Sequence, residues 1–290
     1  MFKGSIVAIV TPFKNNTVDE EKLRELVEFQ ISGGSDAIVP CGTTGESSTL
    51  DYREHDRVIE IVIQQVGKRV PVIAGTGSNS TAETIDLTRK AKEMGADGCL
   101  LVTPYYNKPT QEGLYHHYTA IADAVALPQI LYNVPGRTAV NLLPETVARL
   151  AEHTNIVAIK EATGSLQQAS EILALVGDKI DVFSGDDFIT FPMMTCGAKG
   201  VISVTANIMP AEIAALVDAF HAGDLEKARR LHLRTLKINN AMFVESNPVP
   251  VKTALGLMGK CSDEVRLPLC PMSDTNKGKL TAIMKKQHLI

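Results

Sequence analysis

One pattern recurs from the start of the chain to about residue 205, and it limits what the 290 residues can fold into. A short apolar run rich in Val and Ile is followed by a polar or Gly-rich turn, and then by a segment with helical periodicity. The runs begin about 20 to 34 residues apart, which leaves room for one strand, one helix and two loops in each repeat. The eight runs occupy residues 5–10, 36–40, 70–74, 97–102, 128–132, 156–160, 180–183 and 200–204.

The runs are continuously apolar rather than alternating, which predicts strands that are buried on both faces and therefore parallel. Eight strand–helix units in strict alternation predict an α/β protein with a closed (β/α)8 barrel. A doubly wound open sheet is the alternative. It is disfavoured because no Gly-rich dinucleotide fingerprint follows the first run.

The strand pattern stops after residue 204, and everything from Pro210 onward has helical character. Breaks are expected at Gly223-Asp224, at Pro248 and at Pro250. The sequence therefore predicts a barrel over residues 1–224 and an all-helical C-terminal domain over 225–290. No low-complexity linker separates the two, so we expect the helical domain to pack on the barrel.

Several helix ends are marked in the sequence. A helix opens at residues 18–21 and ends at Gly33-Gly34. Ser80 is expected to be an N-cap that forms a capping box with Glu83. Pro144 is expected at the first position of a helix over residues 144–153.

The composition bears on several classes of function. Lys and Arg total 29 against 33 Asp and Glu, a net charge of −4, which argues against a nucleic-acid binder. His, Cys and carboxylate side chains do not gather at metal-ligand spacings, so we expect neither a metal nor a cofactor. The five Cys residues form no C-x-x-C pair, and their odd number predicts buried free thiols in a reducing compartment. The apolar stretch 5–10 is too short for a signal peptide or a membrane span, so we expect a cytoplasmic protein.

Lys160 is the most informative single residue. Active sites of such barrels lie at the C-terminal ends of the strands, and Lys160 closes the sixth apolar run. Desolvation in an apolar wall lowers a lysine pKa, and a neutral amine can attack a ketone to form a Schiff base. The alternative is a structural lysine paired with Glu161 or with an aspartate after the seventh run.

Two tyrosines and a threonine favour the chemical interpretation. Tyr132 ends the fifth run, next to the sixth, so its ring should lie beside Lys160. A phenol can move a proton when a hydrogen-bonded relay holds its hydroxyl, and Tyr106 and Thr44 could extend that relay. The alternative for each tyrosine is an amphipathic residue of the barrel wall.

The remaining strand ends carry groups suited to a small anionic ligand. The turn over residues 42–45 should expose backbone N–H groups to a carboxylate. Arg137 could bind a carboxylate with its planar fork, or it could be a solvated surface residue. Gly185 would let a ligand approach closely, whereas Asp186 and Asp187 are expected to cap the following helix rather than act as bases. His116 and His117 are interpreted as surface residues. These residues together predict a cofactor-free barrel enzyme, a lysine Schiff-base aldolase acting on a small keto acid.

The chain resembles the dihydrodipicolinate synthase family from end to end. The segments that carry the resemblance are 42–47 (GTTGES), 103–109 (TPYYNKP), 132–138 (YNVPGRT), 159–164 (IKEATG), 184–187 (SGDD), 200–204 (GVISV) and 247–252 (NPVPVK). The resemblance implies a (β/α)8 TIM barrel with a C-terminal helical domain, in a homotetramer. It also implies the condensation of pyruvate with L-aspartate 4-semialdehyde on the route to diaminopimelate and lysine.

The resemblance also implies roles for individual residues. Lys160 would be the imine lysine and Tyr132 the proton carrier beside it. Thr44 would link Tyr132 to Tyr106, which would reach into the active site of the neighbouring subunit. The substrates would be bound by Thr43, Thr44 and the Gly45 backbone at the pyruvate carboxylate, by Gly185 and Ile202 along the pocket wall, and by Arg137 at the carboxylate of the aldehyde.

Members of this family often carry a feedback site for L-lysine at a subunit interface. Glu83 could pair with the ammonium group of lysine, while Asn79 and Tyr105 could bind its carboxylate. Tyr52 stands where some sensitive members have a second histidine, which departs from the pattern. The positions that match the site are Ser47, Ser48, His55, Asn79, Glu83 and Tyr105.

Three alternatives remain open at this point. The nearest is another pyruvate-dependent aldolase or lyase, such as a sialic-acid lyase, although the loop around Arg137 resembles that of the synthase branch. A non-catalytic small-molecule-binding barrel would keep the pocket without turnover. A phosphate-binding barrel isomerase is disfavoured because residues 205–210 lack a Gly-rich phosphate cradle.

Overall fold

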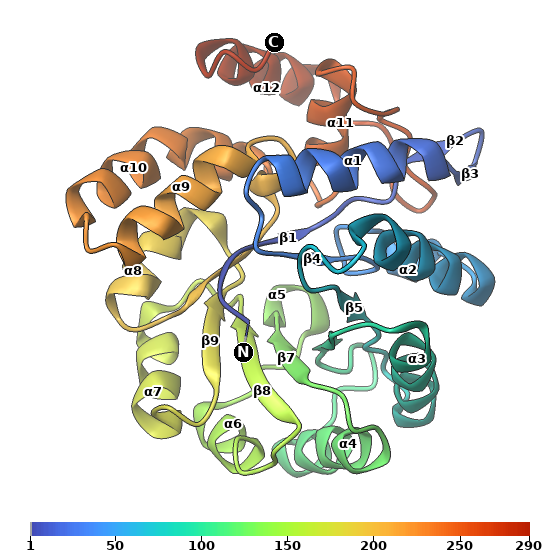
Figure 1. The fold of residues 1–290 in the computed structure, drawn as a ribbon, viewed down its shortest axis with the longest axis vertical. Helices are drawn as coiled ribbons and strands as arrows, with labels where there is room; N and C mark the ends of the chain where they lie inside the picture. Colours follow the sequence, from blue (N-terminus) through green and yellow to red (C-terminus); the bar gives the residue numbers. More distant parts are fainter. Residues whose placement is uncertain (1) are drawn as a thin grey trace.

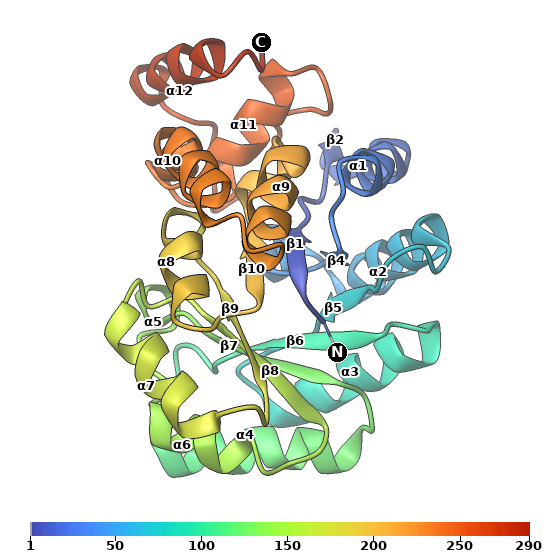
Figure 2. The same ribbon diagram turned by 60° about the vertical axis from the view of Figure 1, so that its left-hand side comes forward.

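The structure is a computed structural model that describes residues 2–290. Eight parallel strands form one sheet in the order β4-β1-β10-β9-β8-β7-β6-β5. The end strands β4 and β5 meet through a bridge between Ile38 and Val72, so the sheet closes into the predicted barrel (Figures 1 and 2). The strands are β1 (Gly4–Ala8), β4 (Ala37–Val39), β5 (Ile73–Gly75), β6 (Gly98–Val102), β7 (Gln129–Asn133), β8 (Ile156–Glu161), β9 (Asp181–Ser184) and β10 (Gly200–Ser203).

Each predicted apolar run overlaps one of these strands to within one residue at the ends where the strand extends past the run, which confirms the fold class. The sequence analysis missed a small hairpin between β1 and the first helix, made of β2 (Phe13–Lys14) and β3 (Thr17–Val18). Strands of two residues carry too little periodicity to be recognised.

Two layers of apolar side chains explain why the runs are continuous. Residues on one face of each strand fill the barrel interior, among them Ile6, Val39, Ile130 and Phe183. Residues on the other face, such as Ile159, pack against the surrounding helices in a larger core. Both faces of the sheet are therefore buried from solvent, as expected for a parallel sheet.

The pairing of β7 with β8 contains one irregularity. Between two consecutive residues of β7, the partner in β8 changes from Ile156 to Ala158, so Val157 is an extra residue. Beyond this bulge the register is regular, and Tyr132 lies directly beside Lys160. Side chains of directly paired residues leave the sheet on the same face, and these two enter the barrel at its mouth.

Helices surround the barrel (Figure 1). They are α1 (Glu20–Ser32), α2 (Tyr52–Val66), α3 (Thr81–Met94), α4 (Gln111–Ala124), α5 (Pro135–Thr138), α6 (Pro144–Leu150), α7 (Leu166–Val176), α8 (Thr190–Thr195) and α9 (Pro210–His221). The 3-10 helices are η1 (Ser47–Thr49), η2 (Asp187–Ile189) and η3 (Thr205–Asn207).

The predicted helix ends are mostly confirmed. Gly33 is the C-cap of α1, and Pro144 occupies the first position of α6, which ends at Leu150 rather than at residue 153. Ser80 caps α3 by accepting a hydrogen bond from the Glu83 amide. The full capping box is wrong, because the Ser80 amide donates to Ser78 and the Glu83 carboxylate binds other groups.

The C-terminal region is helical and lies against one side of the barrel (Figure 2). It comprises α10 (Leu225–Ala241), α11 (Val249–Leu257) and α12 (Asp274–Lys286), with α10 packed along α9. The break at Gly223-Asp224 is confirmed, and Asp224 caps α10. Pro250 does not break a helix, because it lies in the first turn of α11, where a missing N–H costs no hydrogen bond. The boundary between domains at residue 224 stays a prediction.

Two predictions about polar residues are wrong in part. All five Cys are free, but Cys196 and Cys270 are exposed rather than buried. His117 is buried rather than on the surface, and its Nδ1 lies 2.9 Å from Thr81 Oγ1. Burial lowers the pKa of His117 to about 4. Among residues 2–290, no helix is long and apolar enough to cross a membrane.

Candidate active site

A small cavity of about 140 Å³ lies at the mouth of the barrel, where the C-terminal ends of β7, β8 and β9 meet. The structure brings five of the predicted site residues together around it: Thr44, Tyr132, Arg137, Lys160 and Gly185. Two residues not selected for the site, Asp186 and Asn247, complete its polar lining.

Lys160 is buried with 4% of its surface exposed, and its Nζ lies 4.4 Å from the centre of the Tyr132 ring. Within residues 2–290, its ammonium group forms no ion pair with a carboxylate. Burial lowers the pKa of Lys160 to about 8, although the nearby negative charges of Asp186 and Asp187 act in the opposite direction. A substantial fraction of the amine is therefore neutral close to physiological pH.

Within residues 2–290, no carboxylate forms the ion pair with Lys160 that the structural alternative requires, although the charge of Asp186 acts on its pKa. Glu161 follows it in the strand and therefore points to the other face, where its carboxylate accepts hydrogen bonds from Asn133 Nδ2 at 3.0 Å and from the Thr163 amide at 2.8 Å. Asp187 accepts hydrogen bonds from the amides of Val204 and Thr205. Both carboxylates are thus committed elsewhere.

The predicted capping roles of the two aspartates need correction. Asp186 occupies the N-cap position of η2, but its side chain makes no capping bond and lines the cavity instead. Burial raises the pKa of Asp186 to about 6, and the positive charge of Lys160 limits the rise. Asp187 does bind helix N-terminal amides, but at η3, which follows β10, and not at η2.

Tyr132 is buried, and burial raises the pKa of its phenol to about 12, against the lowering influence of Arg137 and of a hydrogen bond with Thr43. The expected link from Tyr132 through Thr44 to Tyr106 stays a prediction. Thr44 Oγ1 accepts a hydrogen bond from Asn247 Nδ2 at 3.0 Å. Tyr106 is 90% exposed with a backbone φ of 72°, and it does not line the cavity of its own chain.

The turn over residues 42–45 folds back on itself. The Gly45 amide donates to Gly42 O at 3.0 Å, so this N–H is used inside the turn and is not free for a ligand as expected. Within residues 2–290, the amides of Thr43 and Thr44 have no hydrogen-bond partner. These two are the donors that the turn offers to an anion.

The packing around Gly185 leaves no room for a side chain at this position. A Cβ at this position would lie 2.5 Å from Ala162 Cβ and 3.1 Å from Lys160 Cε. A larger residue would therefore displace the lysine. Ile202 is fully buried in the barrel interior and does not line the cavity, which differs from the expected role.

Arg137 lies on α5, the short helix that follows β7. Arg137 is an exposed residue that lines the cavity, and its guanidinium donates one hydrogen bond to Asn247 O at 3.2 Å. No carboxylate within residues 2–290 pairs with it, so its bidentate face is available to an anion.

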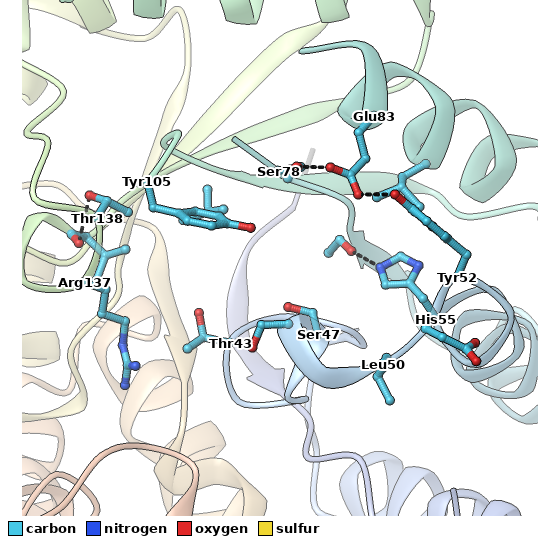
Figure 3. Close-up of a pocket in the computed structure, with 17 residues that line it drawn as sticks. Thr43, Ser47, Leu50, Tyr52, His55, Ser78, Glu83, Tyr105, Arg137 and Thr138 are labelled. Atoms are coloured by element: carbon cyan, nitrogen blue, oxygen red, sulfur yellow. Dashed lines mark hydrogen bonds between the residues drawn. The ribbon is translucent and has the colours of Figure 1, made fainter. Parts of the chain in front are cut away.

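A second, larger cavity of about 560 Å³ lies beside the first (Figure 3). Its lining includes five of the six residues predicted for an effector: Ser47, Ser48, His55, Glu83 and Tyr105. The sixth, Asn79, does not line it, but its Nδ2 donates to Tyr105 O at 3.2 Å. The group is assembled from the ends of β4, β5 and β6 and from α2 and α3.

Glu83 is the charged centre of this cavity. Its carboxylate accepts hydrogen bonds from Ser78 Oγ and from the Tyr52 hydroxyl at 2.7 Å (Figure 3). These bonds hold the pKa of Glu83 below its usual value. His55 Nε2 donates to Gly75 O at 2.9 Å, and burial lowers the pKa of the imidazole. Ser78 was missed by the sequence analysis because a serine near a helix start is most often a cap.

Comparisons with known proteins agree with this geometry. Residues 1–287 match the model of the dihydrodipicolinate synthetase family. A relative from Geobacter sulfurreducens named 4-hydroxy-tetrahydrodipicolinate synthase is 83% identical over 290 residues, which cover 100% of both sequences. The chloride-inhibited dihydrodipicolinate synthase from Acinetobacter baumannii, solved in complex with pyruvate, has a TM-score of 0.98 and 50% identity, covering 100% of both chains.

A further similar structure is the enzyme from Cyanidioschyzon merolae with lysine bound, with a TM-score of 0.97 and 42% identity, covering 100% of this chain and 99% of the other. The family match spans nearly the whole chain, and the identities lie far above the level at which fold alone is shared. The chain therefore belongs to the dihydrodipicolinate synthetase family, and it is an enzyme of the lyase class.

Proposed function

We propose that the chain condenses pyruvate with L-aspartate 4-semialdehyde to give 4-hydroxy-tetrahydrodipicolinate, in the biosynthesis of diaminopimelate and lysine. The observation that carries the proposal is the buried, unpaired Lys160 beside the Tyr132 ring. The name of the 83% identical relative and the pyruvate complex of the Acinetobacter enzyme support this choice of substrates.

The chemistry begins at Lys160. Its neutral amine adds to the ketone of pyruvate, and loss of one water gives the imine. Removal of a methyl proton gives the enamine, whose carbon attacks the aldehyde of the second substrate and forms the new C–C bond. Hydrolysis or internal amine attack at the imine then releases the product and regenerates the lysine.

Tyr132 carries the protons of these steps. Its high pKa keeps the phenol protonated, so it can donate to the carbinolamine oxygen and recover the proton through its hydrogen bond with Thr43. Thr44 stands next in the same turn, and we propose that it continues the relay. The unpartnered amides of Thr43 and Thr44 receive the pyruvate carboxylate.

Arg137 binds the carboxylate of the aldehyde substrate at the cavity mouth, where its guanidinium has no acidic partner. Tyr106 completes the relay in the neighbouring subunit of a homotetramer. This role is supported by its 90% exposure and by its absence from the cavity of its own chain.

L-Lysine is the proposed effector of the larger cavity. The Glu83 carboxylate would receive the ammonium group, and Asn79 with Tyr105 would receive the carboxylate. Lysine bound to the Cyanidioschyzon relative supports this assignment. A cytoplasmic location belongs to the same proposal, because the Cys residues are free thiols.

Borohydride trapping in the presence of pyruvate tests the proposal. Peptide mass analysis should find a reduced pyruvyl adduct on Lys160. If a known aldolase is trapped under the same conditions and this chain is not, the non-catalytic binding barrel becomes the better interpretation. Turnover with aspartate semialdehyde against sugar-derived aldehydes then separates the synthase from related lyases.

A further inference from the structure

The turn that carries Thr43 and Thr44 begins and ends in an unusual backbone conformation. Cys41 before it has a φ of 54°, and Glu46 at its end has a φ of 53°. Neither is glycine, and the left-handed region costs side-chain-bearing residues energy unless other interactions hold them there. The interactions that hold Glu46 come from the C-terminal region.

Glu46 is held by a buried ion pair with a residue of α11. Lys252 Nζ lies 2.6 Å from Glu46 Oε1, and the two side chains are 0% and 1% exposed. The second carboxylate oxygen accepts a hydrogen bond from the Arg266 amide at 3.1 Å. The Phe13 ring covers the ammonium group, with its centre 4.1 Å from Nζ. Burial lowers the pKa of Lys252, and the charge of Glu46 opposes this change.

The same segment holds the turn at a second point. Asn247, just before α11, donates to Thr44 Oγ1 and accepts from Arg137 through its main-chain oxygen. A third contact comes from the N-terminal part of the chain, where Thr11 Oγ1 donates to Gly45 O at 2.7 Å. Neither Glu46 nor Lys252 lines either cavity, so the pair cannot touch a substrate there.

We propose that Glu46 and Lys252 are a positioning pair, which fixes the turn so that the Thr43 and Thr44 amides and hydroxyls stay aligned over Lys160. The C-terminal helix α11 thereby contributes to pyruvate binding and imine formation without contacting the substrate. This inference rests on the proposed function.

A buried ion pair is suited to this task because it is favourable only when the two side chains keep one relative arrangement. Its desolvation penalty offsets most of its attraction, so replacing both charges by neutral side chains of similar volume is often close to neutral in stability. Removing one partner leaves the other charge buried and is strongly destabilising. Positioning and stability can therefore be measured separately.

The test uses the double variant Glu46→Gln/Lys252→Met in the full-length enzyme. We expect its melting temperature to lie near that of the unmodified enzyme, because no unpaired charge remains. We expect the KM for pyruvate to rise about tenfold and the borohydride trapping rate of Lys160 to fall by a similar factor, with the KM for the aldehyde within about twofold.

Two further variants make the result unambiguous. Ile121→Ala, in the fully buried core of α4, lowers the melting temperature without contact to the turn and should leave both KM values unchanged. Glu46→Gln/Lys252→Gln also removes both charges, and because a Gln side chain is shorter than a Lys side chain it loosens the contact, so we expect the KM for pyruvate to rise in the same direction. It also serves as the test if the Met variant fails to fold.

Normal pyruvate KM and trapping rate in the Gln/Met double variant would overturn the inference, and the pair would then serve stability alone. The same conclusion follows if the Gln/Met variant fails to fold and the Gln/Gln variant folds with a normal pyruvate KM and trapping rate. Failure of the unmodified enzyme to form the Lys160 adduct would instead contradict the proposed function.

Discussion

The two cavities at the barrel mouth share part of their lining, but they differ in whether the ionisable side chain in each has polar partners. Arg137 lines both, and consecutive residues of one turn divide between them, with Thr43 at the larger and Thr44 at the smaller. In the smaller, Lys160 is buried without an ion partner among residues 2–290. In the larger, the Glu83 carboxylate has two hydrogen-bond donors.

Both ionisable groups have a lowered pKa, but the consequence differs. Lowering the pKa of a lysine favours its neutral, nucleophilic form, whereas lowering the pKa of a glutamate preserves its charge. Burial of a lysine without a charged partner therefore favours the neutral amine, which can form a bond to a substrate. Hydrogen bonds to a charge prepare it to bind an opposite charge reversibly. The following experiments test whether the cavities divide in this way.

The largest effect is expected for Lys160→Ala. It removes the nucleophile, so activity should fall by about three orders of magnitude or more, and borohydride with pyruvate should give no adduct. Circular dichroism should be unchanged, because no structural ion pair is lost. Residual activity within about tenfold of normal would show that the small cavity does not work through an imine.

Arg137→Ala should lower kcat/KM for the aldehyde about 100-fold, because a charge-assisted bidentate contact is lost. The KM for pyruvate and the trapping rate should hardly change. Arg149→Ala is the matched control, since Arg149 pairs with Glu112 on the outer helices. An equal rise in both KM values would place Arg137 in pyruvate binding instead.

Tyr106→Phe should slow turnover about tenfold or more, because a relay hydroxyl is lost, while the exposed ring leaves the fold intact. If Tyr106 acts in a neighbouring subunit, mixed oligomers of Lys160→Ala and Tyr106→Phe chains should recover activity. Hybrids confirmed by native mass spectrometry that stay inactive would refute the cross-subunit role.

Glu83→Gln should weaken inhibition by L-lysine about tenfold or more and leave uninhibited turnover close to normal, because the charge that receives the ammonium group is removed. Initial rates at increasing lysine concentration measure the effect, with the exposed Glu112→Gln as the control. Full lysine sensitivity in the Glu83 variant would leave the larger cavity without its proposed effector.

The smallest effect concerns pH. Imine formation needs the neutral amine, so the trapping rate should rise with pH through an inflection near the Lys160 pKa of about 8. The negative charge of Asp186 raises that pKa, so Asp186→Asn should move the inflection to lower pH. A shift to higher pH would mean that another group controls the amine.

Most of the fold could be predicted from the sequence because its elements are marked locally. Strands buried on both faces appear as continuous apolar runs, and each run overlapped one strand. Parallel strands in a barrel end on the same side, so reading the strand ends also brought Lys160, Tyr132 and Arg137 to one place.

The rest depends on contacts between distant segments, for which a single sequence carries no signal. Asn247 binds Thr44 across about 200 residues, and the choice of Thr43 as the partner of Tyr132 depends on the exact path of a turn. Asp186 occupies an N-cap position without capping, and its side chain instead lines the cavity, where the charge of Lys160 influences its pKa. Charge interactions of this kind follow from the fold and not from local preference.

The bulge at Val157 has a consequence for how this enzyme tolerates change in chain length. If pairing with β7 continued regularly from Ile156, Ile159 would stand beside Tyr132 and the side chains of β8 would exchange faces. The amine would then point into the helical layer, and the carboxylate of Glu161 would point into the barrel. Loss of the Val157 codon should therefore be tolerated, because it removes only the extra residue and leaves Lys160 beside Tyr132, whereas loss of the Ile159 codon should move the nucleophile out of the site without altering its identity.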